Sequence, residues 1–143
     1  CSEAIRRAIS IPFLHIAEAT AEVILEQNLR KVALLGTKFT MEKDFYRGIL
    51  ERDFGIEVFI PDEAGRQQVH DIIYGELVHG QIRNESRTVY QTIIRELAER
   101  GAEGVVLGCT EIPLLIGAGD VSIPVFDTTA IHAEKAVAWA LKK

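Results

Sequence analysis

The chain alternates short runs of apolar, often β-branched residues with longer segments of helical periodicity, and this alternation constrains its fold more than any other feature. The apolar runs occupy residues 11–16, 32–35, 56–60, 105–107 and 123–126. They lack the strict apolar–polar alternation of a strand that has one solvent-exposed face. This absence favours parallel strands that are covered on both faces. The helical faces between and after them are formed by Ala21, Ile24 and Leu25; Met41, Phe45 and Ile49; Val69, Ile72, Ile73 and Leu77; Val89, Ile93 and Leu97; and Ala133, Ala136, Val137, Ala140 and Leu141. The pattern predicts an α/β fold, a parallel sheet with flanking helices.

Composition excludes several other classes of protein. The 143 residues are 48% apolar and 26% charged, which is typical of one globular domain. The net charge of −5, with scattered basic residues, argues against a nucleic-acid partner, and the longest apolar run is far too short to cross a bilayer. The only cysteines are Cys1 and Cys109, and no CxxC or HxxxH spacing occurs, so neither a disulfide scaffold nor a metal site is expected. Without a signal-like N-terminus, a cytoplasmic location is the expectation.

An internal similarity points to duplication. Residues 10–15 (SIPFLH) resemble residues 122–127 (SIPVFD), 112 positions later, and a helical segment follows each. Self-similarity of this kind predicts a repeated lobe of about that length. The alternative is coincidence, because a proline-led strand followed by a helix is common.

The segment GVVLGCTEIP, residues 104–113, carries the sharpest chemical signal. A buried strand ends at Gly108, and a thiol, a hydroxyl and a carboxylate follow in Cys109, Thr110 and Glu111. Ligands of open α/β sheets bind at the carboxyl ends of strands, where a thiolate can act as nucleophile or base. The alternatives are that Cys109 is an inert, buried apolar residue and that Glu111 is a solvated surface carboxylate.

Two further strand ends carry polar residues. Thr37 and Thr40 follow the run at 32–35, where hydroxyls and backbone N–H groups suit a carboxylate or phosphate, although Thr40 could simply cap a helix that begins at Met41. Neither GxxxxGK[ST] nor GxGxxG is present, so no nucleotide-binding loop is expected. Residues 127–129 (DTT) have the same two interpretations, a helix cap or part of a binding site. His132 is interpreted as a packing or surface residue.

The chain resembles the aspartate/glutamate racemase family. The run VVLGCTEIPLLI (residues 105–116) is similar to the second-cysteine motif of these enzymes, and its GCTE form is typical of aspartate and broad-specificity racemases, whereas glutamate racemases of cell-wall synthesis have His at the position of Glu111. Further similarity covers IPFLHIAEAT (11–20), VALLGTKFTMEKDFYRG (32–48) and IPVFDTTAIHAEKAV (123–137).

The resemblance implies racemisation without a cofactor by two cysteines. One thiolate removes the α-proton of the amino acid, and a thiol on the opposite face returns a proton, so each of two pseudo-symmetric lobes supplies one cysteine. By resemblance, Cys109 is the base of the second lobe and Glu111 assists it. Thr40 and Thr110 match positions that bind the substrate carboxylate, with Thr37 as a weaker candidate.

The family's first-lobe features, a Gly-rich strand end and a Cys followed by Asn-Thr, do not occur in this sequence. Cys1 is followed by Ser-Glu-Ala and is interpreted as lying beyond that motif, inside the next helix. The resemblance therefore predicts one whole lobe at residues 30–117, a tail of the first lobe at 1–29, and a strand and helix returning to the first lobe at 118–143. The strands near Ile11 and Ile123 are expected in the first-lobe sheet. Exposed edges predict a homo-oligomer, and the chain by itself is expected to be inactive.

Two other functions remain open from the sequence: a cysteine-dependent decarboxylase or maleate-type isomerase of the same superfamily, and a non-catalytic truncated lobe. The small-molecule partner is expected to be an acidic amino acid. No lysine occurs between Lys43 and Lys135, where some aspartate-preferring relatives carry one, so broad use of aspartate and glutamate is preferred. Three cations are alternatives for the side-chain carboxylate: Arg66, Arg83 and Arg87.

Overall fold

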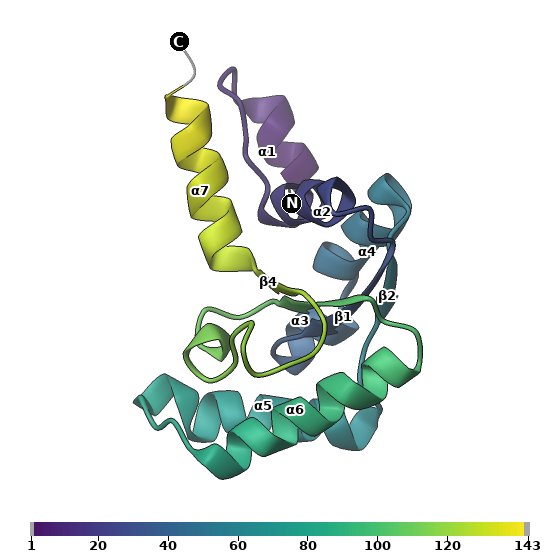
Figure 1. Cartoon of the computed structure of the whole chain (residues 1–143). Coiled ribbons are helices and arrows are strands. Elements are labelled where there is room, and N and C mark those ends of the chain that lie inside the picture. The colour runs from purple at the N-terminus through teal and green to yellow at the C-terminus, as the bar shows by residue number, and fades with distance from the viewer. Residues whose placement is uncertain (1, 142–143) are drawn as a thin grey trace.

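The short strands of the protein assemble into a single parallel sheet. The computed structural model describes residues 2–141. The strands are β1 (Lys31–Leu35), β2 (Glu57–Phe59), β3 (Gly104–Leu107) and β4 (Val125–Asp127). They lie in the order β2-β1-β3-β4, and Figure 1 shows the sheet across the middle of the molecule. All pairings are parallel, with Ala33 opposite Val105 and Val105 opposite Val125.

Each face of the sheet is covered by its own hydrophobic cluster. Ala33 and Leu35 point to one cluster, whereas Val32 and Leu34 point to the other. Because successive side chains of a strand point to opposite faces, a strand buried on both sides needs apolar residues at every position. This is why β1 and β3 appear in the sequence as unbroken apolar runs.

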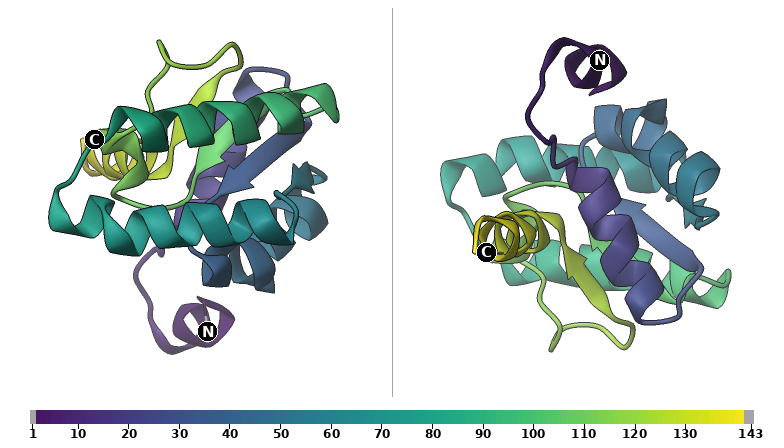
Figure 2. Two further views of the ribbon diagram at one scale, coloured as in Figure 1. Left: turned by 90° about the horizontal axis from the view of Figure 1, so that it is seen from below. Right: turned by 90° about the horizontal axis from the view of Figure 1, so that it is seen from above.

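Helices form the two outer layers. On one face lie α5 (Glu63–Gly75) and α6 (Asn84–Glu99), joined through the short η1 (Leu77–His79) and a turn in which Gly80 has a φ of 70°. On the other face lie α2 (Ile16–Glu26) and α4 (Asp44–Phe54). Figure 2 shows α5 and α6 lying over the sheet from one side and α2 crossing it from the other.

Two terminal helices lie at the margin of this arrangement of a sheet between two helical layers. Helix α7 (Thr128–Ala140) follows β4 and packs beside α2, and α1 (Ser2–Ala8) has no buried residue. Both project from the same side of the sheet in Figure 1. The α/β class predicted from the sequence is confirmed, with strands near 32–35, 56–60, 105–107 and 123–126.

The predicted strand at residues 11–16 was wrong. No strand forms there, and Ile16 instead begins α2. A strand persists only when a neighbouring strand accepts its hydrogen bonds, and Pro12 has no N–H to donate. The segment is held by other contacts, among them a 3.2 Å contact between His132 Nε2 and the Leu14 carbonyl.

The expectation that the strand near Ile123 belongs to a different sheet was also wrong. The strand starts at Val125 and pairs with β3 as the fourth strand of the same sheet. Its Phe126 is buried in the same cluster as Val106 of β3. Local pairing and shared burial therefore place β4 with β3.

The helical face through Met41, Phe45 and Ile49 belongs to two helices. Helix α3 (Lys38–Glu42) ends before Lys43, whose backbone is extended (φ −96°, ψ 149°), and α4 starts at Asp44. The break buries Met41 fully but leaves Phe45 47% exposed. A single helix would place both on one face, so the sequence pattern missed the break.

The internal similarity extends to helix capping. His15 Nδ1 accepts from the Ala17 N–H at 3.1 Å and begins α2, while Asp127 Oδ1 accepts from the Thr129 N–H at 2.9 Å and begins α7. The two caps occupy equivalent positions in the two similar segments. Within residues 2–141, none of the helices has both the length and the apolar character needed to cross a membrane.

Candidate active site

The predicted site residues lie beyond the carboxyl ends of the two central strands. Thr37 and Thr40 follow β1, whereas Cys109, Thr110 and Glu111 follow β3. The two strands are paired to their last residues, since Leu35 lies opposite Leu107. The pairing continues one step further, because the Gly108 N–H donates to the Leu35 carbonyl at 2.7 Å. The sheet therefore brings both polar groups to the same edge.

Thr40 lies against both of the glycines that end these strands. A Cβ atom on Gly36 would lie 2.9 Å from Thr40 Cβ, and one on Gly108 would lie 3.0 Å from Thr40 Cγ2. Real Cβ atoms rarely approach so closely, so a side chain at either glycine would push Thr40 away. The glycines thus allow Thr40 to sit directly beside the turn that carries Cys109.

Thr37, not Thr40, caps the following helix. The Thr37 hydroxyl accepts from the Thr40 N–H at 3.3 Å and lies 3.2 Å from the Thr40 hydroxyl. The alternative in which Thr40 caps a helix beginning at Met41 is therefore wrong, because α3 already starts at Lys38. The Thr40 side chain does not serve as a cap.

Cys109 and Glu111 form a hydrogen-bonded pair. The thiol is half-buried against the cluster under α5 and α6, and its Sγ donates to Glu111 Oε2 at 2.9 Å. Burial, and after it the hydrogen bond to the negative Glu111, raise the pKa of Cys109 to about 11. Hydrogen bonds from the side chains of Cys109 and Thr110 lower the pKa of Glu111. At neutral pH the pair is a neutral thiol donating to a carboxylate.

The residues at the end of β4 and the start of α7 have structural roles. Thr128 is buried, and its hydroxyl donates to the Leu107 carbonyl at 2.8 Å, which ties the start of α7 to the last residue of β3. Asp127 caps α7. The segment at 127–129 is therefore a helix cap, and it fixes the strand end from which Cys109 departs.

The three arginines considered for a substrate side chain are already paired with carboxylates at 2.9–3.7 Å: Arg66 with Glu42, Arg83 with Glu76, and Arg87 with Asp120. Among residues 2–141, no three His, Cys, Asp or Glu side chains gather in a way that could hold a metal ion. Cys1 lies outside the described residues.

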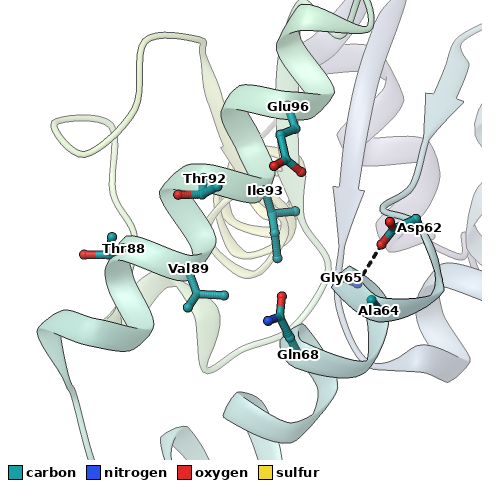
Figure 3. A pocket seen from close by; sticks show the side chains of 9 residues that line it. All are labelled: Asp62, Ala64, Gly65, Gln68, Thr88, Val89, Thr92, Ile93 and Glu96. Carbon is teal, nitrogen blue, oxygen red and sulfur yellow. Dashed lines mark hydrogen bonds between the residues drawn. The ribbon is translucent and has the colours of Figure 1, made fainter.

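A surface hollow of about 310 Å³ lies elsewhere, between α5 and α6. Asp62, Gln68, Thr92 and Glu96 are among the residues that line it (Figure 3). None of the five predicted site residues belongs to it. The hollow lies in a helical layer, away from the sheet edge that carries Cys109.

One contact at the site was missed from the sequence. The Lys38 N–H, at the start of α3, donates to His70 Nδ1 of α5 at 3.3 Å. His70 is one of four histidines that lie far apart in the sequence. Nothing in the spacing of residues 38 and 70 could have shown this contact, which depends on how α5 packs beside α3.

The chain has clear relatives among known proteins. The chain belongs to the Asp/Glu/hydantoin racemase family, whose model matches residues 2–136. This confirms the family predicted from the sequence.

Individual relatives agree with this assignment. The chain is 27% identical to the broad-specificity amino-acid racemase RacX of Bacillus subtilis over 97% of its length. Among solved structures, it is similar to a Yersinia pestis protein assigned as an Asp/Glu racemase (50% identity over 99% of this chain, TM-score 0.95). It also resembles an aspartate racemase homologue from Pyrococcus horikoshii OT3 (42% over 96%, TM-score 0.91). The chain spans 59%, 61% and 60% of these three proteins, respectively.

Proposed function

We propose that this chain supplies the Cys109 half of a cofactor-independent racemase for acidic amino acids, aspartate and glutamate. The observation that carries the proposal is the 2.9 Å hydrogen bond from the Cys109 thiol to Glu111 at the carboxyl edge of the sheet. Membership of the racemase family supports the reaction class. The family supports an acidic substrate, and the hydroxyl groups at the same edge suit a carboxylate.

In this scheme the Cα–H bond of the substrate breaks on one face, and its proton goes to a thiolate. A thiol on the opposite face gives up its S–H proton to the same carbon, which inverts the centre with no net oxidation or reduction. A thiol with a pKa of about 11 is protonated at neutral pH, so Cys109 is poised as the proton donor. In the reverse direction its thiolate is a strong base, because burial and the neighbouring Glu111 carboxylate both disfavour that charge.

The hydroxyls of Thr40, Thr110 and Thr37 are proposed to bind the substrate carboxylate. Thr40 is the strongest of the three, because its side chain lies over Gly36 and Gly108 at the junction of β1 and β3. Thr110 is exposed beside the thiol, while the Thr37 oxygen already accepts the Thr40 N–H.

The second acid–base group must come from outside residues 2–141, since Cys109 is the only cysteine among them. We propose that residues 30–117, completed by the paired strand β4, are the body of one lobe and that segment 1–29 and helix α7 contact the other half of the site. Their exposed apolar side chains support this arrangement: Ile5, Ile9 and Ile11 on one segment, and Val137, Trp139 and Leu141 on the other. Homo-oligomer formation is the further expectation, testable by light scattering.

A chimera tests the proposal. Residues 1–143 replace the matched segment of the Yersinia pestis relative, which is 50% identical over 99% of this chain. With L-aspartate or L-glutamate in heavy water, the chimera is expected to form the D-isomer with deuterium at Cα, and its Cys109→Ser variant is expected to form none. Residues 1–143 alone should be inactive, because one face of the substrate lacks an acid or base.

The same assay separates the competing functions. Release of carbon dioxide would indicate a decarboxylase, and conversion of maleate to fumarate would indicate an isomerase of that type. A folded chimera that turns over none of these substrates, or a Cys109→Ser chimera that racemises at the parent rate, would overturn the proposal.

A further inference from the structure

Helix α3 carries the threonines of the candidate site but is too short to be stable by itself. It has five residues, Lys38–Glu42, capped by Thr37 and containing Thr40. Isolated helices of this length do not persist in water, because nucleating the first turn costs more than a few hydrogen bonds return. The position of Thr40 must therefore be maintained by contacts from elsewhere in the fold.

Helix α5 makes such contacts at both ends of α3. Arg66 Nε donates to Glu42 Oε1, the last residue of α3, at 2.9 Å. One turn further along α5, His70 Nδ1 accepts the N–H of Lys38, the first residue of α3, at 3.3 Å. Residues four apart on a helix lie on the same face, so Arg66 and His70 form one stripe directed at α3.

Each side chain of this stripe is itself held in place. Arg66 also donates from its NH1 group to the Pro61 carbonyl at 2.8 Å, and its side chain is only 21% exposed. The His70 ring packs on Tyr74, one turn further, with ring centroids 4.7 Å apart. Because Nδ1 accepts a hydrogen bond from the Lys38 N–H, it carries no proton, and the ring proton resides on Nε2.

We propose that Arg66 and His70 are positioning residues that hold α3 against α5 and thereby set the location of Thr37 and Thr40 at the carboxyl edge of the sheet. The structural part of this inference stands without the proposed function. Its consequence for substrate binding rests on the proposed function, since it assumes that these hydroxyls bind the substrate carboxylate.

A matched pair of substitutions isolates the His70 contact. The side-chain oxygen of asparagine can occupy the place of Nδ1, whereas glutamine extends its acceptor beyond that place. We therefore expect His70→Asn to preserve the contact with Lys38 and His70→Gln to lose it. Gln67→Ala is the control on the same helix, because Gln67 bonds only its exposed neighbour Asp71 in a side-chain contact.

Amide hydrogen exchange on residues 1–143 measures the structural effect. The reporters are the Met41 N–H, which donates to the Thr37 carbonyl, and the Lys43 N–H, which donates to the Phe39 carbonyl. Losing a hydrogen bond of ordinary strength should lower their protection about fivefold in His70→Gln and in Arg66→Gln. His70→Asn and Gln67→Ala should match the parent chain. Unchanged protection in both glutamine variants of the stripe, or equal loss in His70→Asn and His70→Gln, would overturn the proposal.

The substrate consequence is measured in the racemising chimera. His70→Gln should raise KM for aspartate about fivefold while kcat changes by less than about twofold, and His70→Asn should restore the parent KM. An inactive chimera would refute the proposed function while leaving the exchange result to decide the positioning role. Normal KM in an active His70→Gln chimera would refute the link between α3 and substrate.

Discussion

Cys109 and Glu111, two residues apart in the chain, are joined by a 2.9 Å hydrogen bond that the thiol Sγ donates to a carboxylate oxygen. The contact contributes to pKa shifts of opposite direction in the two groups. Burial and then the carboxylate raise the pKa of the thiol, whereas the thiol, together with Thr110, lowers the pKa of the carboxyl group.

Removing the charge of Glu111 should make the thiol more acidic. In Glu111→Gln the negative acceptor is gone, so the pKa of Cys109 should fall below its present value of about 11. Alkylation by iodoacetamide at pH 8, measured in a Cys1→Ser background, should accelerate on the order of tenfold, because the thiolate is the reactive form. An alkylation profile identical to that of the parent chain would show that Glu111 does not govern this thiol.

Gly108 should not tolerate a side chain. In Gly108→Ala the new Cβ would meet Thr40 Cγ2 at 3.0 Å and the Leu35 carbonyl at 3.2 Å, and the strain should cost about 1–3 kcal/mol of unfolding free energy. Thr40→Ser removes the methyl group and should recover part of that cost in the double variant. Urea titration measures both.

Gly75→Ala is the matched control. It lies at the end of α5, and a Cβ there would meet nothing within 4 Å. It should stabilise the protein by about 0.5–1 kcal/mol, because alanine loses less backbone freedom on folding. Equal destabilisation by both glycine substitutions would contradict the crowding of Thr40.

Thr128→Val should destabilise the strand end that leads to Cys109. Valine matches the shape of threonine but leaves the buried Leu107 carbonyl without the 2.8 Å hydrogen bond, at a cost of about 1–3 kcal/mol. Thr129→Val is the comparison, since that side chain is exposed and should change stability little. Thermal unfolding of the two variants tests this, and equal melting temperatures would argue against the bond.

The cap of α2 should weaken in mild acid. Burial lowers the pKa of His15 below its ordinary 6.5, Glu18 opposes the shift, and Arg6 and His132 add to it. A lowered folded-state pKa means that the unfolded chain binds more protons. The contribution of the cap is therefore complete above about pH 6.5 and is lost as the pH falls through the lower value.

His15→Asn keeps a capping side chain that does not titrate. Urea unfolding between pH 7.5 and 5 should show a shallower loss of stability in this variant than in the parent, because asparagine caps at every pH in that range. If the free energy of unfolding fell equally with pH in the two proteins, protonation of His15 would not be the cause of the acid sensitivity.

The sequence predicted the strands that are buried on both faces, because such strands leave an unmistakable apolar run. β1 and β3 are examples, and the polar residues directly after them predicted which edge would carry the site. Neither inference required knowledge of long-range packing. The same reasoning failed at residues 11–16, where an apolar run with a proline has no neighbouring strand to pair with in residues 2–141.

What could not be predicted depends on contacts between distant segments. The break at Lys43 separates α3 from α4 although the apolar spacing continues through it. The His70 contact with Lys38 joins residues 32 positions apart and has no local pattern. These features arise only when α5 has packed on the sheet, so they cannot be predicted from the residues that neighbour them in the sequence.

The strand order β2-β1-β3-β4 has a consequence for where chemistry can occur in this protein. The chain leaves β1 toward β2 on one side, whereas β3 continues to β4 on the other, so the connections diverge between β1 and β3. In open α/β sheets, ligands bind at such a topological switch point, outside the carboxyl ends of the strands. The location of the site is therefore a property of connectivity, and the thiol, hydroxyl and carboxylate side chains that follow β1 and β3 can be exchanged for others of different chemistry without moving it.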